Sequence, residues 1–139
     1  MLSASIEDYA KAIYVLEDEH GVASTSALAE RLGVSAPAVS AMVKKLDTQG
    51  FVSHVRYRGV RLTPKGRRLA LEVLRHHRLL ETYLVEELGL PVDNVHAEAE
   101  VLEHVLSEGL EDVIAAKLGE PTHDPHGDPI PRRDGTVPK

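Results

Sequence analysis

The order of helix-start and helix-stop residues near the beginning of the chain constrains the fold most. Thr25 is a suitable N-cap for a short helix over 26–32, which Gly33 would end. Ser35 is a second suitable N-cap, and the longer helix that follows it would end at Gly50. A short helix, a glycine turn and a longer helix form a helix-turn-helix pattern. The sequence therefore predicts a helix-turn-helix unit in this half of the chain.

Further elements are predicted on both sides of this pair. Residues 5–8 (Ser-Ile-Glu-Asp) have the spacing of a capping box that opens a helix ending at Gly21, and Asp8 would then only complete that box. Two β-prone runs, 51–56 and 60–63, are separated by a three-residue turn that contains glycine. This arrangement predicts a small hairpin, or wing, after the helix-turn-helix pair.

The second half reads as helices followed by a polar tail. Thr63 and Pro64 open a long helix that reaches about Leu88, Asp93 caps a helix over about 94–107, and 110–118 forms another. Five of the eight prolines follow from Pro121 onward, so we expect a loop or linker there and no contribution to the core.

The predicted fold class is mostly α with a small β-hairpin wing. We expect a winged helix-turn-helix DNA-binding domain over 1–63 and a helical metal-binding and dimerisation domain over 64–120, with a proline-rich tail over 121–139.

Charge is distributed unevenly between the two halves. Residues 1–75 carry 11 Lys or Arg and 8 Asp or Glu, a net charge of +3, whereas 76–139 carry 5 and 14, a net charge of −9. The two values sum to the net charge of −6 of the whole chain. A basic segment joined to an acidic one is expected when one part faces phosphates and the other faces metal ions.

The chain has no cysteine, so disulfides and thiolate ligands are excluded and any metal ion must be held by nitrogen and oxygen atoms. No apolar run approaches the roughly 20 residues that a membrane span needs. The N-terminus also lacks the basic-then-apolar pattern of a secretory signal. We therefore expect a cytoplasmic protein with no membrane partner.

In a helix-turn-helix the exposed N-terminal residues of the second helix face the bases of the major groove. The residues in that position are Ser35, Ala36, Pro37, Ala38, Ser40 and Ala41. Small or apolar groups suit contact with thymine methyl groups more than bidentate hydrogen bonding. The basic residues expected to contact phosphates are Lys44, Lys45, Arg56, Arg58 and Arg61. A three-helix bundle with solvated lysines and arginines is the alternative, and the wing and the local positive charge favour double-stranded DNA.

Histidines and carboxylates recur at helical spacing in the second half. His77 and Glu81 share a face of one predicted helix. Four more fall within an arc of about 100° on the next helix: His96, Glu100, Glu103 and His104. Two helices that present Glu and His inward form sites for divalent metals, and donors without sulfur favour Mn²⁺ or Fe²⁺. The alternative is an acidic solvated surface, since other acids such as Glu111 lie nearby.

The same residues could instead belong to an enzyme. Residues 100–104 (Glu-Val-Leu-Glu-His) are similar to the His-x-x-Glu-His motif of inverted zinc proteases, but a glutamate stands at the first position. No Ser or Cys nucleophile stands nearby, and a coordination sphere filled by protein ligands would leave no position for an activated water. We therefore expect no enzymatic activity. A metal-independent winged-helix regulator is the remaining alternative.

Taken together, these motifs resemble the diphtheria-toxin-repressor family of metal-dependent transcriptional regulators, which includes manganese-responsive MntR and iron-responsive IdeR types. The resemblance runs from about Ile6 to Arg133. Its most specific parts are Ile6-Glu7-Asp8-Tyr9 before Ile13-Tyr14, Tyr57-Arg58-Gly59 before Leu62-Thr63, His77-Arg78-Leu79-Leu80-Glu81, Val95-His96-Ala97-Glu98-Ala99-Glu100, Glu103-His104 and His126-Gly127-Asp128-Pro129-Ile130-Pro131.

The resemblance implies a homodimeric repressor of metal-homeostasis genes that binds operator DNA and has two metal sites per subunit. One site would use Asp8, Glu100, Glu103 and His104. The other would use His77, Glu81 and His96, and Asp124 and His126 match tail positions that are ligands in some manganese-responsive relatives. Mn²⁺ is the expected activating ion and Fe²⁺ the alternative, and Co²⁺, Zn²⁺ or Cd²⁺ can substitute.

The chain departs from the family pattern at a few positions. Iron-type members tend to have a sulfur ligand where this chain has Asp8 and Glu100, so oxygen donors there resemble the manganese type. Lys11 stands where some manganese-type members place another carboxylate, which argues against a two-manganese cluster built with that residue. Many members carry a third, SH3-like domain, and this sequence ends at Lys139 before it. The resulting hypothesis is a switch in which Asp8 joins the metal ligands of the second half.

Overall fold

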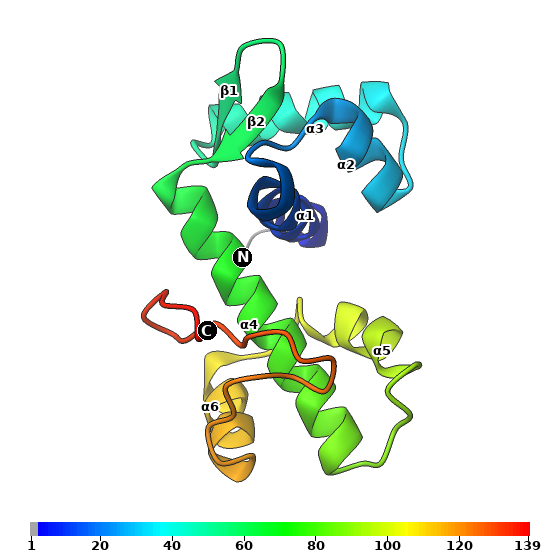
Figure 1. Cartoon of the computed structure of the whole chain (residues 1–139), viewed down its shortest axis with the longest axis vertical. Helices are drawn as coiled ribbons and strands as arrows, with labels where there is room; N and C mark the ends of the chain where they lie inside the picture. The colour runs from blue at the N-terminus through cyan, green and yellow to red at the C-terminus, as the bar shows by residue number, and fades with distance from the viewer. Residues whose placement is uncertain (1–2) are drawn as a thin grey trace. The chain divides into compact units, whose positions relative to one another are not determined.

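The computed structural model describes residues 3–139, and the first predicted domain therefore begins two residues before the described part. The chain divides into two compact units, one ending at Ala70 and the other beginning at Leu71. The elements in chain order are α1 (Ala4–His20), α2 (Thr25–Leu32), α3 (Ala36–Thr48), β1 (Val52–Val55), β2 (Gly59–Leu62), α4 (Pro64–Glu86), α5 (Val95–Leu102) and α6 (Glu108–Lys117) (Figure 1). This architecture confirms the predicted fold class, mostly α with one hairpin.

Serine side chains begin the three helices of the first unit. Ser3, Ser24 and Ser35 each have extended backbone angles and accept a hydrogen bond from the N–H three residues further on. This contact satisfies one of the unpaired donors at each helix start. The prediction of Ser35 is confirmed, whereas Ser5 and Thr25 lie inside α1 and α2 and are not the caps.

The position of Asp8 changes with this correction. Because Ser3 is the N-cap, the third helical position of α1 is Ile6, and Asp8 lies two residues beyond the place that a capping-box carboxylate occupies. Asp8 therefore does not complete a box with Ser5, and the structure removes the simplest explanation for its presence.

The hairpin is attached to the helices by backbone hydrogen bonds. β1 and β2 pair antiparallel from Val52 opposite Leu62 to Val55 opposite Gly59. Ala23 extends this small sheet, because its N–H and carbonyl both bond to Val60, each at 2.9 Å. The apolar face of the hairpin closes over a core whose centre is formed by Leu28, Val39 and Leu46, each with 0% exposure. The hairpin is thus a fixed part of the unit.

The second unit contains most of α4 together with α5, α6 and the C-terminal segment. The hydroxyl of Thr63 accepts from the N–H of Gly66 at 3.1 Å, as expected for the predicted N-cap of α4. α5 is shorter than predicted, because it begins after Asn94 and ends at Leu102. Glu103 follows as the C-cap and has helical backbone angles (φ −59°, ψ −29°). The helical geometry predicted for the donor residues therefore extends one residue beyond α5.

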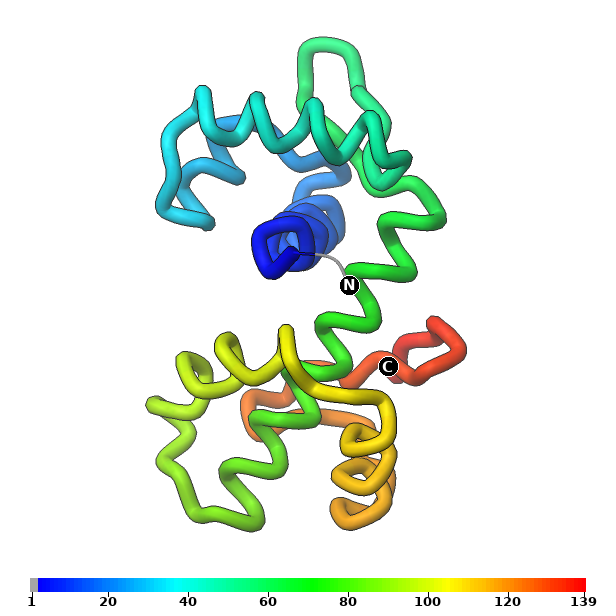
Figure 2. Tube along the Cα trace, turned by 180° about the vertical axis from the view of Figure 1, so that it is seen from behind, coloured from blue at the N-terminus to red at the C-terminus, as the bar shows by residue number. Residues whose placement is uncertain are grey.

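The proline-rich segment has no helix or strand, as predicted, but the prediction that it contributes nothing to the core was wrong. Ile130 has 1% exposure and packs with Leu79, Ala99 and Ile114. We name residues 121–133 the strap. Figures 1 and 2 show it beside α4 and α6, where the guanidinium of Arg75 donates to the carbonyl of Pro131. Local composition indicated a loop, whereas the burial comes from contacts between residues far apart in sequence.

Within the described residues, no helix has both the length and the apolar character that crossing a membrane requires.

Candidate metal centre and nucleic-acid surface

All eleven residues predicted to contact DNA are exposed on the first unit. Ser35 caps α3, and the predicted residues from Ala36 to Lys45 follow on that helix. Arg56 and Arg58 lie in the turn of the hairpin, and Arg61 lies on β2, where its Nε donates to the carbonyl of Gly21 at 2.7 Å. The structure thus exposes α3 and the wing arginines to solvent, which a DNA-binding surface requires, and their contact with DNA stays a prediction.

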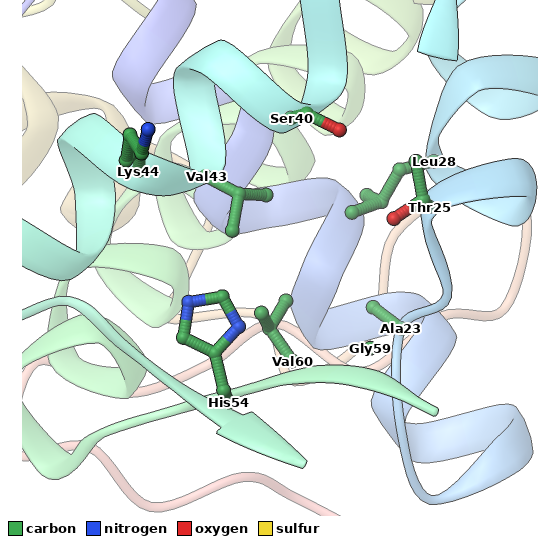
Figure 3. A pocket seen from close by; sticks show the side chains of 9 residues that line it. All are labelled: Ala23, Thr25, Leu28, Ser40, Val43, Lys44, His54, Gly59 and Val60. Atoms are coloured by element: carbon green, nitrogen blue, oxygen red, sulfur yellow. The ribbon is translucent and has the colours of Figure 1, made fainter. Parts of the chain in front are cut away.

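A hollow of about 190 Å³ lies between α3 and the hairpin (Figure 3). It is lined by Ala23, Thr25, Leu28, Ser40, Val43, Lys44, His54, Gly59 and Val60. A wider groove of about 600 Å³ extends from the starts of α2 and α3 to the hairpin turn, where Arg56 and Arg58 border it. A groove between helix N-termini and arginines is suited to phosphate oxygens.

Tyr57 is an exposed wing residue that the sequence analysis did not assign to DNA. It is 91% exposed and has a left-handed backbone (φ +64°), which is uncommon for a non-glycine residue. Its hydroxyl accepts from Arg56 at 3.0 Å, and the guanidinium of Arg56 lies 4.9 Å from the centre of the ring. The pair forms the end of the wing.

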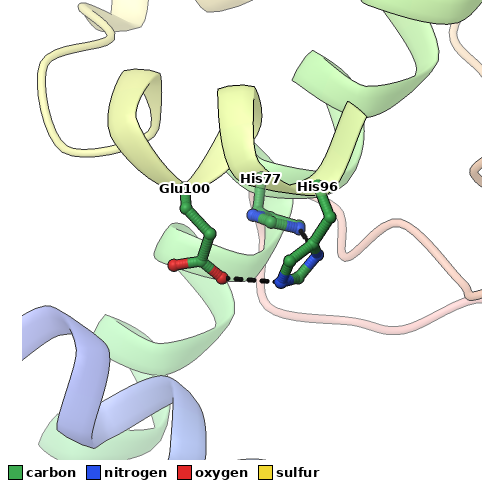
Figure 4. Close-up of side chains that lie close together, drawn as sticks. All are labelled: His77, His96 and Glu100. Atoms are coloured by element: carbon green, nitrogen blue, oxygen red, sulfur yellow. Dashed lines mark hydrogen bonds and ion pairs between the residues drawn. The ribbon is translucent and has the colours of Figure 1, made fainter. Parts of the chain in front are cut away.

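The first group of metal-type donors joins α4 and α5. Nε2 of His77 lies 3.1 Å from Nδ1 of His96, and Nε2 of His96 lies 3.1 Å from an oxygen of Glu100 (Figure 4). One donor atom from each of the three residues lies within 4.8 Å of the others. His77 is 5% exposed, whereas the side chain of His96 is 64% exposed, so this group opens to solvent on one side.

A second group joins α4 to the strap. Glu81, Asp124 and His126 each offer one donor atom within 4.8 Å of the others. Glu81 Oε1 lies 3.2 Å from His77 Nε2, while its Oε2 lies 3.6 Å from His126 Nδ1 and 3.7 Å from His96 Nδ1. Glu81 therefore connects the two groups into one cluster.

The carboxylates of this second group differ in their acid strength. The pKa of Glu81 is lowered, because the hydrogen bond and charge of His77, with His126 and His96, outweigh the effect of its burial. The pKa of Asp124 is raised by burial and by the nearby charges of Asp128 and Glu81, although its Oδ1 accepts from two backbone N–H groups. Several acids crowded around histidines are typical of a cation site.

Three further donors meet where α5 ends. Glu100, Glu103 and His104 each bring one donor atom within 4.8 Å of the others. An oxygen of Glu103, a residue with 2% exposure, lies 3.4 Å from His77 Nδ1 and 3.9 Å from His104 Nε2. Asp8 belongs to α1 in the other unit, so its membership of this group stays a prediction.

The donor chemistry fits a divalent ion of the Mn²⁺ or Fe²⁺ class. Every candidate donor is an imidazole nitrogen or a carboxylate oxygen. Oε2 of Glu81 and Oδ2 of Asp124 are buried without a hydrogen-bond partner among the described residues. Buried polar atoms in native proteins are normally satisfied, so such oxygens beside histidines are suited to bind a cation.

Glu111 lies at the centre of a polar network that the sequence analysis did not foresee. Its side chain is 2% exposed and accepts from Nε of Arg75, from Nε2 of His76 at 3.0 Å and from Arg133 at 3.0 Å. These partners outweigh the cost of burial and lower its pKa to about 2. The pKa of His76 is raised, because the hydrogen bond and charge of Glu111 outweigh burial.

Two protein-family models match the chain one after the other. The model described as "Iron dependent repressor, N-terminal DNA binding domain" matches residues 1–60. The model described as "Iron dependent repressor, metal binding and dimerisation domain" matches residues 63–132. The chain belongs to the iron-dependent repressor family.

Individual relatives agree with this assignment. The iron-dependent repressor IdeR of Mycobacterium tuberculosis is 44% identical over 125 residues, which are 90% of this chain and 54% of the relative. The transcriptional regulator MntR of Geobacillus kaustophilus is 40% identical over 107 residues, 77% of this chain and 75% of that protein. A solved structure titled "Manganese-dependent transcriptional repressor complex with manganese" is 52% identical, with a TM-score of 0.87 over 96% of this chain and 62% of that one. The chain thus spans about half the length of the curated IdeR relative.

In this member of the iron-dependent repressor family, the strap lies almost entirely inside the matched metal-binding and dimerisation region, which extends to residue 132. The burial of Ile130 and Asp124 is consistent with that extent. Family membership therefore includes the segment that composition alone describes as a linker.

Proposed function

We propose that this chain is a metal-dependent transcriptional repressor of metal-homeostasis genes, activated for operator binding by Mn²⁺, with Fe²⁺ as the alternative ion. The observation that carries this proposal is the contact of His77 and His96 with Glu81, on the same chain as an exposed helix-turn-helix and wing. A cation cluster on the same chain as a DNA-binding unit is better suited to regulation than to catalysis. The names of the relatives describe repressors, and metallohydrolysis remains the disfavoured alternative.

The preference for manganese rests on the donors. Oxygen and imidazole ligands suit Mn²⁺, and the chain contains no cysteine thiolate that would select softer metals. At the positions of Asp8 and Glu100, where iron-type relatives tend to have sulfur, the chain supplies carboxylates. The ion would supply positive charge that holds these carboxylates together, and the protein residues would fix their geometry.

We propose that Asp8 is the metal ligand from the DNA-binding unit, on the basis of the family resemblance and of the corrected N-cap at Ser3. A ligand changes a conformational equilibrium only through its different affinities for the two states. A site that needs Asp8 would supply this difference. Replacing Asp8 with Ala should remove metal-stimulated DNA binding without unfolding the chain, and an unchanged response to Mn²⁺ would contradict this role.

A homodimer is proposed from the apolar surface of the second unit. Among the described residues, five of the nine large exposed apolar side chains lie in one segment: Val101, Leu102, Val105, Leu110 and Val113. Contiguous exposed apolar residues mark interaction surfaces, and the matched family model is described as a dimerisation domain. A dimer would present two recognition helices about one DNA turn apart, ~34 Å. Val113→Lys should shift sedimentation toward the monomer.

DNA binding with and without metal tests the proposal. A binding sequence would first be selected from a random double-stranded library in the presence of Mn²⁺, and fluorescence anisotropy would then measure affinity with Mn²⁺, Fe²⁺, Zn²⁺ or a chelator. Salt must be held constant, because phosphate contacts make affinity strongly salt-dependent. We expect binding that needs Mn²⁺ or Fe²⁺.

Two variants make the test specific. His77→Ala removes a buried donor and should abolish the metal response. His123→Ala is the matched control, since this exposed histidine of the strap lies outside the donor groups and contacts Thr122. DNA binding of equal strength with the chelator would instead support a metal-independent winged-helix regulator.

A further inference from the structure

The residues that flank His77 on α4 contact the segments that carry the other candidate metal ligands. Arg75 donates to the carbonyl of Pro131, and Arg78 donates to the carbonyl of Pro129 at 2.6 Å. His76 places Nδ1 3.3 Å from the carbonyl oxygen of Glu103. One turn of α4 thus contacts both segments that carry the remaining donors, the end of α5 and the strap.

Glu111 connects these contacts to one another. Its Oε1 accepts from Arg75, and its Oε2 accepts from both His76 and Arg133 at 3.0 Å. Arg75 lies on α4, whereas Arg133 is the last residue of the strap. A single buried carboxylate on α6 is therefore shared by α4, the strap and, through His76, the end of α5.

The strap contains no helix or strand, and its internal hydrogen bonds close only a small loop. Backbone bonds run from Asp124 N–H to the Asp128 carbonyl at 2.9 Å, from Gly127 N–H to the Asp124 carbonyl at 3.0 Å and from Ile130 N–H to the Thr122 carbonyl at 2.8 Å. Oδ1 of Asp124 accepts from two further backbone N–H groups of the same loop. This loop carries Asp124 and His126 toward Glu81. These bonds fix the shape of the loop but not its position against α4, so without anchored ends its donors would meet the cluster only part of the time.

We propose that Glu111 is a positioning residue for the metal centre, which fixes the Glu103 end of α5 through His76 and the Asp124–His126 loop through Arg75 and Arg133. Glu111 touches no metal ion in this scheme, since its two oxygens are occupied by the three basic side chains. The inference rests on the proposed metal-dependent function and adds that metal affinity is controlled from α6. Partners behind the first ligands typically change metal affinity by about 10- to 100-fold when they are removed.

Glu111→Gln tests this role, because it removes the charge and keeps the size of the side chain. Titration calorimetry should show Mn²⁺ affinity lower by about 10- to 100-fold. Hydrogen exchange of the metal-free chain should show faster exchange of the Asp124 and Ile130 amides. The acceleration should be larger there than at the amides of Leu79 and Leu80 in α4, whereas a general loss of stability alone would accelerate all of these amides by the same factor.

Variants of Arg133 keep the test informative if Glu111→Gln folds poorly. Arg133 is half exposed, and Arg133→Gln removes one of the three partners of Glu111. It should accelerate exchange in the strap and weaken Mn²⁺ binding, while Arg133→Lys should restore part of both. Asp112→Asn is the matched control, because Asp112 is an exposed second partner of Arg133 at 2.9 Å and does not contact the network otherwise.

The outcomes separate this inference from the function on which it rests. A wild-type chain that binds neither Mn²⁺ nor Fe²⁺ would overturn both. A wild type that binds Mn²⁺, together with Glu111→Gln and Arg133→Gln variants that bind it equally well, would overturn only the positioning role. Equal acceleration of exchange in the strap and in α4 would also overturn it, because Glu111 would then be only a stabilising residue of the core.

Discussion

Gly59 at the start of β2 offers the sharpest test of how the wing is held. A Cβ atom at this position would lie 2.0 Å from the carbonyl oxygen of Ala23 and 2.8 Å from Cα of Ser24. Both are backbone atoms, so no flexible side chain can move aside. The backbone of Gly59 also has a φ of +134°, which residues with side chains rarely adopt. Gly59→Ala must therefore separate the hairpin from Ala23.

The cost can be worked out from the contacts that would be lost. The two hydrogen bonds between Ala23 and Val60 contribute about 1 kcal/mol each. Strain in a sparsely populated backbone region adds about 1–3 kcal/mol. We therefore expect Gly59→Ala to lower the free energy of unfolding by about 3–5 kcal/mol, the sum of these contributions.

Urea unfolding followed by circular dichroism would measure this loss, with DNA anisotropy as a second readout for the displaced wing. Gly109→Ala is the matched control, because Gly109 lies in α6 and no atom would meet its Cβ within 4 Å. That change should be neutral or stabilise the chain by up to about 1 kcal/mol. If Gly59→Ala unfolded within about 1 kcal/mol of the wild type and bound DNA equally, the argument from the Ala23 contact would be refuted.

Three other changes have calculable effects. Leu28→Ala should lower the free energy of unfolding by about 2–5 kcal/mol in urea titrations, because Leu28 is fully buried and leaves a cavity; a loss below 1 kcal/mol would mean that the core collapses around it. Ser35→Ala should cost about 1 kcal/mol by removing the α3 cap, and an unchanged melting temperature would argue against that cap. The pKa of Glu111 is lowered from 4.5 to about 2, so its ionised form stabilises the metal-free chain above pH 4.5, by up to about 3 kcal/mol, and this stabilisation is lost as the pH falls toward 2. The stability difference between wild type and Glu111→Gln should shrink over that range, and a constant difference would contradict the ionised state.

Features determined by neighbouring residues could be read from the sequence. The serine cap and glycine stops around α2 and α3 act within a few residues, and Gly33 ends α2 with φ +68° as expected. The i,i+4 spacing of His77 and Glu81 likewise brings them to 3.2 Å. Errors at helix starts have a local cause, since Ser24 and Thr25 are adjacent and both are good N-caps.

Features determined by distant contacts could not be read in this way. α5 ends early because Ser107 caps the next helix, and a continuous helix to that point would leave no residues for the turn between them. The buried state of Glu111 depends on Arg75, 36 positions earlier, and the strap depends on bonds that span up to 56 positions. The sequence shows that Glu111 and much of the strap are polar, but their burial depends on tertiary contacts that the sequence does not reveal.

The cluster draws its donors from positions as far apart as His77 and His126, which are 49 residues distant. In an unfolded chain these donors do not meet, so an ion held by all of them binds only the folded protein. Free ion at 100 times its dissociation constant would then stabilise the fold by about 2.7 kcal/mol. Metal shortage would thus also raise the unfolded fraction that proteases degrade. The amount of folded protein, as well as its metal loading, would then depend on the supply of the ion.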